Sequence, residues 1–142
     1  MAEATLADRQ ILRAKLYVPR GRPGAVARSR LYARLDDGVR RDLTVVSAPA
    51  GFGKTTLLAQ WRAVAGGGRV AWVSLDEGDN DPTRFWSYLV AALRTVEPEV
   101  GTVALEALGG PSVELERVVV PSLVNDWPRW GRRWCWSWTT TT

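Results

Sequence analysis

The sequence predicts an α/β fold in which a parallel sheet is flanked by helices. Two short apolar runs, residues 43–48 and 70–75, are rich in β-branched residues and bounded by turn residues, which is typical of strands buried on both faces. A segment whose apolar residues have helical spacing follows each run. This alternation of strand and helix indicates parallel strands joined by right-handed crossovers.

Residues 1–41 are predicted to form a basic lead-in to this domain. The stretch YVPRGRPG combines two prolines with two glycines, which excludes a regular element there. Residues 29–35 can form a short helix with Leu31 and Leu35 on one face. Single arginines between apolar residues favour a solvated helix face, although a basic arm is also a candidate for contact with nucleic acid.

The first strand, residues 43–48, leads through a glycine-rich loop into a predicted helix over residues 55–65. The apolar residues of this helix recur at helical spacing: Leu57, Leu58, Trp61 and Val64. The three glycines at 66–68 are expected to end it.

The second strand, residues 70–75, leads into an acidic loop, residues 76–81. Asp81 is the expected N-cap and Pro82 the first residue of the helix that follows. Its apolar stripe consists of Phe85, Trp86, Leu89, Val90 and Leu93. A further helical stretch is expected from Ser112, with an interruption at Pro121.

The composition fits one packed domain, with 142 residues of which 46% are apolar. The absence of histidine excludes histidine acid-base chemistry and histidine metal sites. A single cysteine, Cys135, excludes an internal disulfide framework. The sequence has neither a long apolar run nor a secretory signal, so we expect a cytoplasmic protein without membrane contact.

The stretch APAGFGKT, residues 48–55, is the motif that indicates chemistry. It matches G-x-x-x-x-G-K-[ST] at every fixed position except the first, where Ala48 replaces glycine. Gly51 and Gly53 allow the backbone to curl so that successive N–H groups face an anion. The following helix directs its positive dipole end to the same point, and together these features predict a phosphate-binding loop, or P-loop.

The candidate binding residues form one continuous run: Ala50, Gly51, Phe52, Gly53, Lys54, Thr55 and Thr56. Lys54 is expected to reach the β- and γ-phosphates, and Thr55 to ligate Mg²⁺ together with the nucleotide. Hydrolysis also requires an acidic residue at the end of a neighbouring strand. Asp76 and Glu77 follow the second strand and are candidates for this role.

From about residue 15 to residue 126 the chain resembles the MalT-like branch of the LuxR-type transcription regulators, which are ATPases of the STAND class. The resemblance rests on KLYVPR, VARSRL, LTVVSAPAGFGKTTLLAQW and VAWVSLDEGDNDPTRFWSYLVAAL. The last stretch is the most specific, because these residues stand where the family has them: Asp76, Glu77, Asp79, Asn80, Asp81, Pro82, Phe85 and Tyr88.

The resemblance implies a signal-transduction switch whose cofactors are ATP and Mg²⁺. In this family an inducer and ATP drive self-association, slow ATP hydrolysis resets the switch, and a C-terminal helix-turn-helix binds DNA. This sequence has no counterpart of that helix-turn-helix. The resemblance further implies that Val26 and Arg28 border the adenine.

Residues 127–142 depart from the family pattern. The family has an apolar strand ending in acidic residues there, the Walker B strand, whereas this sequence reads WPRWGRRWCWSWTTTT after Asp126. The codons of Trp, Cys and Thr allow few base sequences. When these bases are read in a frame shifted by one base, they encode an apolar run that ends in aspartate. We therefore hypothesise a frameshift at or just before Trp127. A Trp-rich tail that binds a partner or a membrane surface is the alternative.

The expected organisation is a lead-in (1–41), a partial P-loop nucleotide-binding domain (42–126) and an aberrant tail (127–142). The expected fold is an incomplete three-layer P-loop NTPase fold that lacks the Walker B strand and later strands. Because unpaired buried strand groups are costly, we expect this chain alone to be poorly folded, to bind ATP weakly or not at all, and not to be catalytic. A small P-loop kinase and a basic nucleic-acid-binding fragment are the alternative functions.

Overall fold

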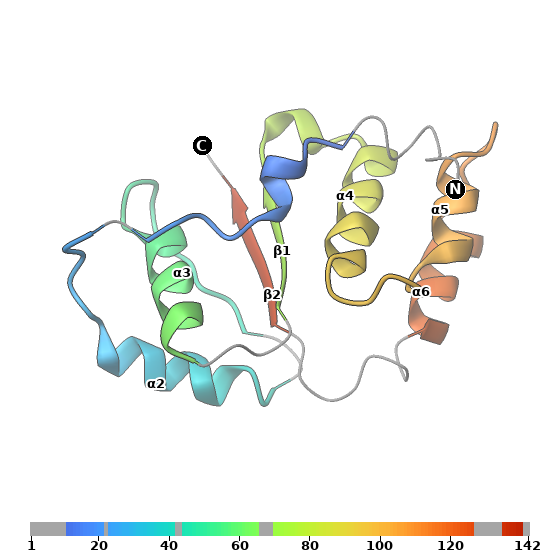
Figure 1. Cartoon of the computed structure of the whole chain (residues 1–142). Helices are drawn as coiled ribbons and strands as arrows, with labels where there is room; N and C mark the ends of the chain where they lie inside the picture. The colour runs from blue at the N-terminus through green and yellow to red at the C-terminus, as the bar shows by residue number, and fades with distance from the viewer. Residues whose placement is uncertain (1–10, 22, 42–43, 66–69, 127–134, 141–142) are drawn as a thin grey trace.

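The computed structural model describes residues 11–21, 23–41, 44–65, 70–126 and 135–140, the last for the backbone only. This part of the chain is mostly helical and contains one pair of parallel strands. Figure 1 shows α2 (Ser29–Gly38) and α3 (Lys54–Val64) on one side of the strands and α4 (Pro82–Arg94) on the other. Two further helices, α5 (Thr102–Leu108) and α6 (Val120–Asp126), lie beyond α4.

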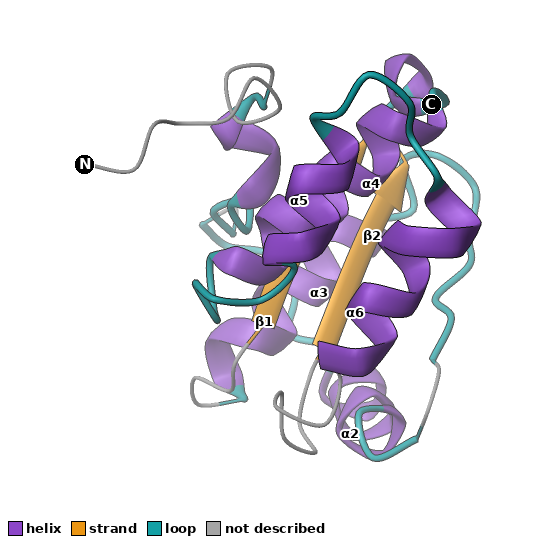
Figure 2. Ribbon diagram, turned by 90° about the vertical axis from the view of Figure 1, so that its right-hand side faces the viewer, coloured by secondary structure: helices purple, strands orange, loops and turns teal. Residues whose placement is uncertain are grey.

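The predicted strand at residues 70–75 is confirmed as β1 (Val70–Leu75). Its consecutive residues Ala71, Trp72 and Val73 are all buried, so both faces of the strand are covered. A second strand, β2 (Cys135–Thr140), pairs with β1 in parallel, with Val70 opposite Cys135 (Figure 2). Residues 135–140 of the tail therefore form a strand that was not expected from their amino-acid sequence.

The predicted strand at residues 43–48 is wrong for the residues that the structure describes there, 44–48. They form no strand, and the side chain of Val45 is 74% exposed. A strand needs a neighbour to pair its backbone groups, and the described residues provide none beside this segment. The layered parallel sheet expected from the sequence is accordingly reduced to the pair of β1 and β2.

The predicted helices around the loops are confirmed, with small shifts at their ends. α2 continues to Gly38, and α3 begins at Lys54. At the start of α4, the side chain of Asp81 accepts the backbone N–H of Arg84 at 2.8 Å, and Pro82 is the first helical residue. The glycines at 66–68, expected to end α3, lie outside the described residues.

The region after α4 holds one helix that the sequence did not predict. The helix α5 starts after Gly101, which has a φ of +68°. A π-helical turn, η3 (Leu115–Val119), then runs directly into α6. Pro121 does not interrupt the helix as expected: it is the second residue of α6 and directly follows the π-helical turn η3.

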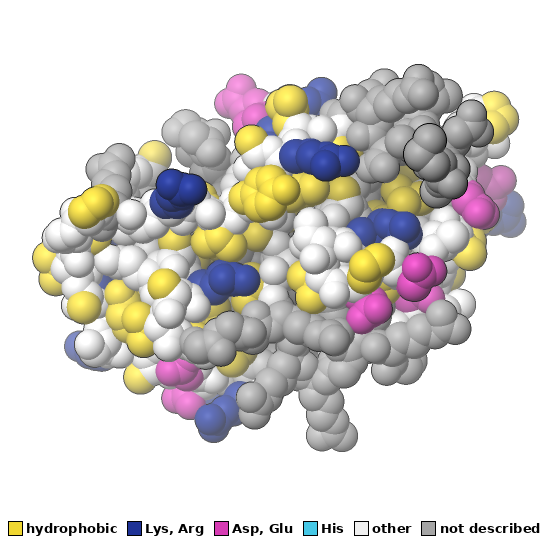
Figure 3. All heavy atoms as spheres, in the orientation of Figure 1, with side chains coloured by type: hydrophobic (Ala, Val, Ile, Leu, Met, Phe, Trp, Pro, Cys, Tyr) yellow, Lys and Arg dark blue, Asp and Glu magenta, His cyan; other side chains and the backbone are white. Residues whose placement is uncertain are grey.

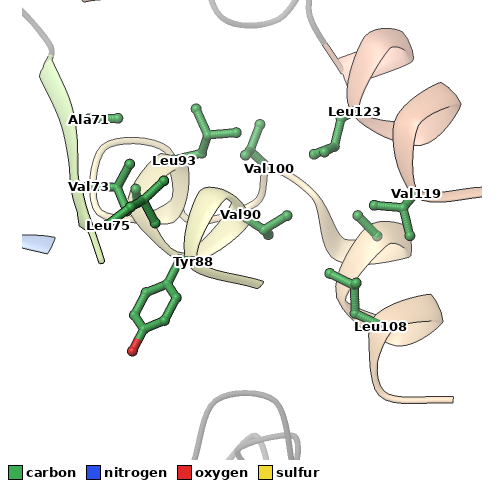
Figure 4. Close-up of a cluster of buried hydrophobic side chains, with 12 residues drawn as sticks. Ala71, Val73, Leu75, Tyr88, Val90, Leu93, Val100, Leu108, Val119 and Leu123 are labelled. Atoms are coloured by element: carbon green, nitrogen blue, oxygen red, sulfur yellow. The ribbon is translucent and has the colours of Figure 1, made fainter. Parts of the chain in front are cut away.

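The apolar core consists of two clusters. The larger one joins β1 to α4, α5 and α6, as Figure 4 shows, and the smaller one joins α2 to α3 through Tyr32, Leu35, Leu57 and Trp61. Two hydrogen bonds accompany the smaller cluster, from Trp61 Nε1 to Asp36 at 2.8 Å and from the Tyr32 hydroxyl to Gln60 at 3.3 Å. None of the helices in the described part of the chain has the length and apolar character needed to cross a membrane.

Candidate functional site

The glycine-rich loop before α3 has the curled backbone that its glycines predicted. Gly51 and Gly53 have φ values of +80° and +75°, a region that residues with a Cβ rarely adopt. The N–H of Phe52 donates to the carbonyl of Pro49 at 3.3 Å, which closes a turn within the loop. Gly53 is also the N-cap of α3, and its carbonyl accepts the N–H of Leu57 at 2.8 Å. The loop thus passes directly into the helix.

The first turn of α3 presents backbone donors at the end of the loop. The N–H groups of the first turn of a helix have no partner within the helix. The N-cap Gly53 supplies no side-chain hydrogen bond, and the first turn contains no acidic residue. The positive end of the helix dipole at Lys54, Thr55 and Thr56 is therefore not neutralised by an acidic cap, which suits an anion.

Lys54 turns back over the loop. Its ammonium donates to the carbonyl of Ala48 and, at 3.0 Å, to the carbonyl of Pro49. The lysine that the motif assigns to the phosphates is thus held by carbonyls of its own loop. A phosphate group would take over one or both of these hydrogen bonds.

The other candidate residues differ in their exposure. Ala50 and Phe52 are exposed, Phe52 to 64%, whereas Thr55 and Thr56 are half-buried. Val26 is 79% exposed and belongs to neither apolar cluster. Arg28, in contrast, lies at the loop: its Nη2 atom is 3.5 Å from the point where a Cβ would stand on Gly53. The structure therefore places the guanidinium of Arg28 near the glycine-rich loop, and it shows no such proximity for Val26.

A charged cluster next to β1 was missed by the sequence analysis. Lys15, on the 3₁₀ turn η1 (Arg13–Leu16), lies 2.7 Å from Asp76 and 2.6 Å from Asp79. Asp79, on the 3₁₀ turn η2 (Glu77–Asp79), also accepts a hydrogen bond from Arg84 at 3.1 Å. The resemblance had marked both aspartates without assigning them a partner. The only signal in the sequence was the lysine of KLYVPR.

The cluster fixes the charge states of two of its members. Burial disfavours the charged form of Lys15, but its hydrogen bonds to Asp76 and Asp79 outweigh that effect and raise the pKa of Lys15. The hydrogen bond from Lys15 lowers the pKa of Asp76 and outweighs the opposing effect of desolvation. Asp76 also accepts the N–H of Gly78 at 2.9 Å. Its carboxylate is thus already engaged, which argues against the role of Mg²⁺ ligand considered for it.

Comparison with known proteins matches part of the sequence to one kind of regulator. No family model matches the sequence. Over 84 residues, or 59% of this chain, the sequence is 49% identical to the HTH-type transcriptional regulator MalT of Serratia proteamaculans (strain 568). Part of this chain is homologous to MalT. The MalT of Cronobacter sakazakii (strain ATCC BAA-894) is 51% identical over 69 residues, or 49% of this chain.

The homology confirms the resemblance to MalT-like regulators for a part of the chain. The matched segments make up 9% of the length of the Serratia MalT and 7% of the length of the Cronobacter MalT. The chain therefore corresponds to a small portion of such a regulator.

Proposed function

We propose that this chain is an ATP-binding part of a MalT-like transcription regulator, and that its P-loop holds the phosphates of the nucleotide. One observation carries the proposal: Gly51 and Gly53 both adopt positive φ immediately before the uncapped N-terminus of α3. The motif of residues 48–55 and the partial homology to MalT support the same assignment.

In this proposal the backbone N–H groups of Gly51 and of residues 53–56 donate to the phosphate oxygens, and the N–H of Phe52 leaves the carbonyl of Pro49 to do the same. Lys54 leaves the carbonyls of Ala48 and Pro49 and contacts the terminal phosphates. The hydroxyl of Thr55 would ligate Mg²⁺, and the ion would neutralise charge on the phosphates. Thr56, which is half-buried on the same turn, would contact the α-phosphate.

The remaining functions of a MalT-like regulator are proposals for a longer protein. The two relatives are named as HTH-type transcriptional regulators, so we propose that the parent of this chain controls transcription. Self-association and DNA binding belong to that proposal. We assign no hydrolysis to this chain, because its sequence departs from the family at the Walker B strand, which carries the acidic residue for that step.

An NMR titration of the chain with Mg²⁺ and ATP tests the assignment. We expect the amide resonances of residues 51–56 to shift, with an affinity that is weak but measurable. Lys54→Ala is expected to abolish these shifts, whereas Arg117→Ala, which removes an exposed cation far along the sequence, should retain them. Equal titration curves for Lys54→Ala and the unmodified chain would refute the proposal.

The alternative of a basic nucleic-acid-binding fragment has less support. The formal net charge is only +4. On the face shown in Figure 3, the Lys and Arg side chains lie in separate groups between apolar and neutral atoms instead of one continuous patch. A DNA-dependent mobility shift that weakens with salt and survives Lys54→Ala would favour this alternative.

A further inference from the structure

We propose that Arg28 contacts the phosphates of the nucleotide, so that two cations, Lys54 and Arg28, serve the P-loop. The proposal rests on the proposed function and specifies which part of the ligand Arg28 reaches. It differs from the family resemblance, which implied that Arg28 borders the adenine.

The first argument is the position of the guanidinium group. The three atoms nearest to the point where a Cβ would stand on Gly53 all belong to Arg28: Nη2 at 3.5 Å, Nη1 at 3.7 Å and Cζ at 4.0 Å. The guanidinium therefore lies against the backbone of the residue that caps α3. Gly53 immediately precedes Lys54, so the two cations flank the same turn of the chain.

The second argument is electrostatic. A cation next to the N-terminus of a helix is unfavourable, because the helix dipole places positive charge there. Arg28 lies at this end of α3, and Lys54 is the first residue of the same helix. The first turn of α3 carries no acidic side chain to offset them. A bound polyanion would turn this repulsive arrangement into an attractive one.

The third argument is that Arg28 has no evident structural task in the described part of the chain. It occupies the N-cap position of α2, but its side chain makes no capping hydrogen bond. The residue is exposed and lines an open hollow at the start of α2, together with Ser29, Arg30 and Arg34. A ligand can therefore reach its guanidinium from solvent.

The chemistry of the guanidinium favours a phosphate over a base edge at this position. Its planar fork donates two parallel hydrogen bonds to a pair of phosphate oxygens. A lysine at the same place would supply the charge but not the fork. We therefore expect Arg28→Lys to retain part of the affinity that Arg28→Ala loses.

The experiment compares three ligands by NMR titration of the full chain: Mg²⁺-ATP, inorganic tripolyphosphate and adenosine. Arg28→Ala is expected to weaken the binding of ATP and of tripolyphosphate by the same factor, about tenfold or more. A loss of this size corresponds to the loss of a charge-assisted hydrogen bond. The response to adenosine should stay as in the unmodified chain. Arg117→Ala removes an exposed charge far along the sequence and should change no affinity by more than about twofold.

Each of the other outcomes contradicts the proposal, and each points to a different explanation. If Arg28→Ala weakens the binding of ATP but not that of tripolyphosphate, Arg28 borders the base and not the phosphates. If Arg28→Ala leaves the binding of both ligands unchanged while Lys54→Ala abolishes it, the P-loop assignment stands and the proposed role of Arg28 is refuted. If the unmodified chain binds neither ATP nor tripolyphosphate, both proposals fall. The amide spectrum of each variant shows whether it keeps its fold, and Arg28→Lys provides a second variant if Arg28→Ala does not.

Discussion

The Nζ atom of Lys15 lies 2.6 Å from the Oδ2 atom of Asp79, and this contact joins the segment before the P-loop to the turn after β1. The side chain of Asp79 is 1% exposed, so its charge requires compensation within the protein. Lys15 and Arg84 supply it, and the N–H of Asp76 donates to the same carboxylate at 2.9 Å. The family-specific stretch around Asp79 is thus an ionic anchor for residues near the start of the described chain.

Replacing Lys15 by methionine should destabilise the chain by about 2 kcal/mol, because it removes one of the two cations from a buried carboxylate. Thermal or urea unfolding followed by circular dichroism measures this change. Arg13→Met, on the same turn but exposed, should change the stability by less than about 0.5 kcal/mol. Equal effects of the two substitutions would show that Lys15 does not anchor the turn.

The same anchor should make stability depend on pH at both extremes. The pKa of Asp76 is lowered in the folded chain, so its contribution is present above the ordinary value of about 4 and is lost as the pH falls through the folded pKa. The pKa of Lys15 is raised, so its contribution is present below about 10.4 and is lost as the pH rises through the folded pKa. The stability difference between the unmodified chain and Lys15→Met should therefore be constant from about pH 5 to 9 and shrink on either side. A difference that varies between these limits would point to other titrating groups.

Tyr88→Phe should cost about 1 kcal/mol and speed hydrogen exchange at the amide of Leu12. The ring of Tyr88 is fully buried, and Figure 4 shows its hydroxyl pointing away from the apolar neighbours. That hydroxyl accepts the N–H of Leu12 at 3.2 Å. Tyr17→Phe removes a hydroxyl from a side chain that is 65% exposed and should be close to neutral. Unchanged exchange at Leu12 in Tyr88→Phe would argue that this hydrogen bond does not hold the segment.

Gly101→Ala should destabilise the chain by about 3 kcal/mol, and Gly24→Ala by only about 1 kcal/mol. Both glycines have positive φ, +68° and +78°, so both substitutions incur backbone strain. A Cβ on Gly101 would stand 2.8 Å from Cγ1 of Val90, whereas a Cβ on Gly24 meets nothing within 4 Å. The difference in unfolding free energy between the two variants isolates the steric clash. Equal losses of unfolding free energy in the two variants would mean that the side chains around Val90 can move to accommodate the added Cβ without destabilising the chain.

The parts of the fold that depend on local sequence were predicted from it. β1 is a continuous apolar run, and α4 begins with an Asp-Pro pair that sets its N-cap, so their positions follow from neighbouring residues. The positive φ angles in the loop before α3 likewise follow from the placement of Gly51 and Gly53. Whether those residues bind a nucleotide stays a prediction.

The parts that depend on distant residues were not predicted. Residues 44–48 have the composition of a strand, but pairing requires a neighbour, and the described residues provide none there. The anchor between Lys15 and Asp79 joins segments far apart in the sequence, and nothing local to either residue indicates the other. α5 is only seven residues long, too short for its periodicity to be distinctive. The frameshift hypothesis for residues 127–142 stays a prediction, and residues 127–134 lie outside the described part.

The pairing of β1 with β2 has a consequence for the order of events during synthesis. Val70 pairs in register with Cys135, so the whole stretch that includes α4, α5 and α6 is made before β1 meets its partner strand. On the ribosome, which adds roughly 5–20 residues per second, the edge of β1 stays open for several seconds. An open strand edge can pair with other chains. The nascent polypeptide is therefore most prone to aggregation in the interval between the emergence of β1 and that of β2.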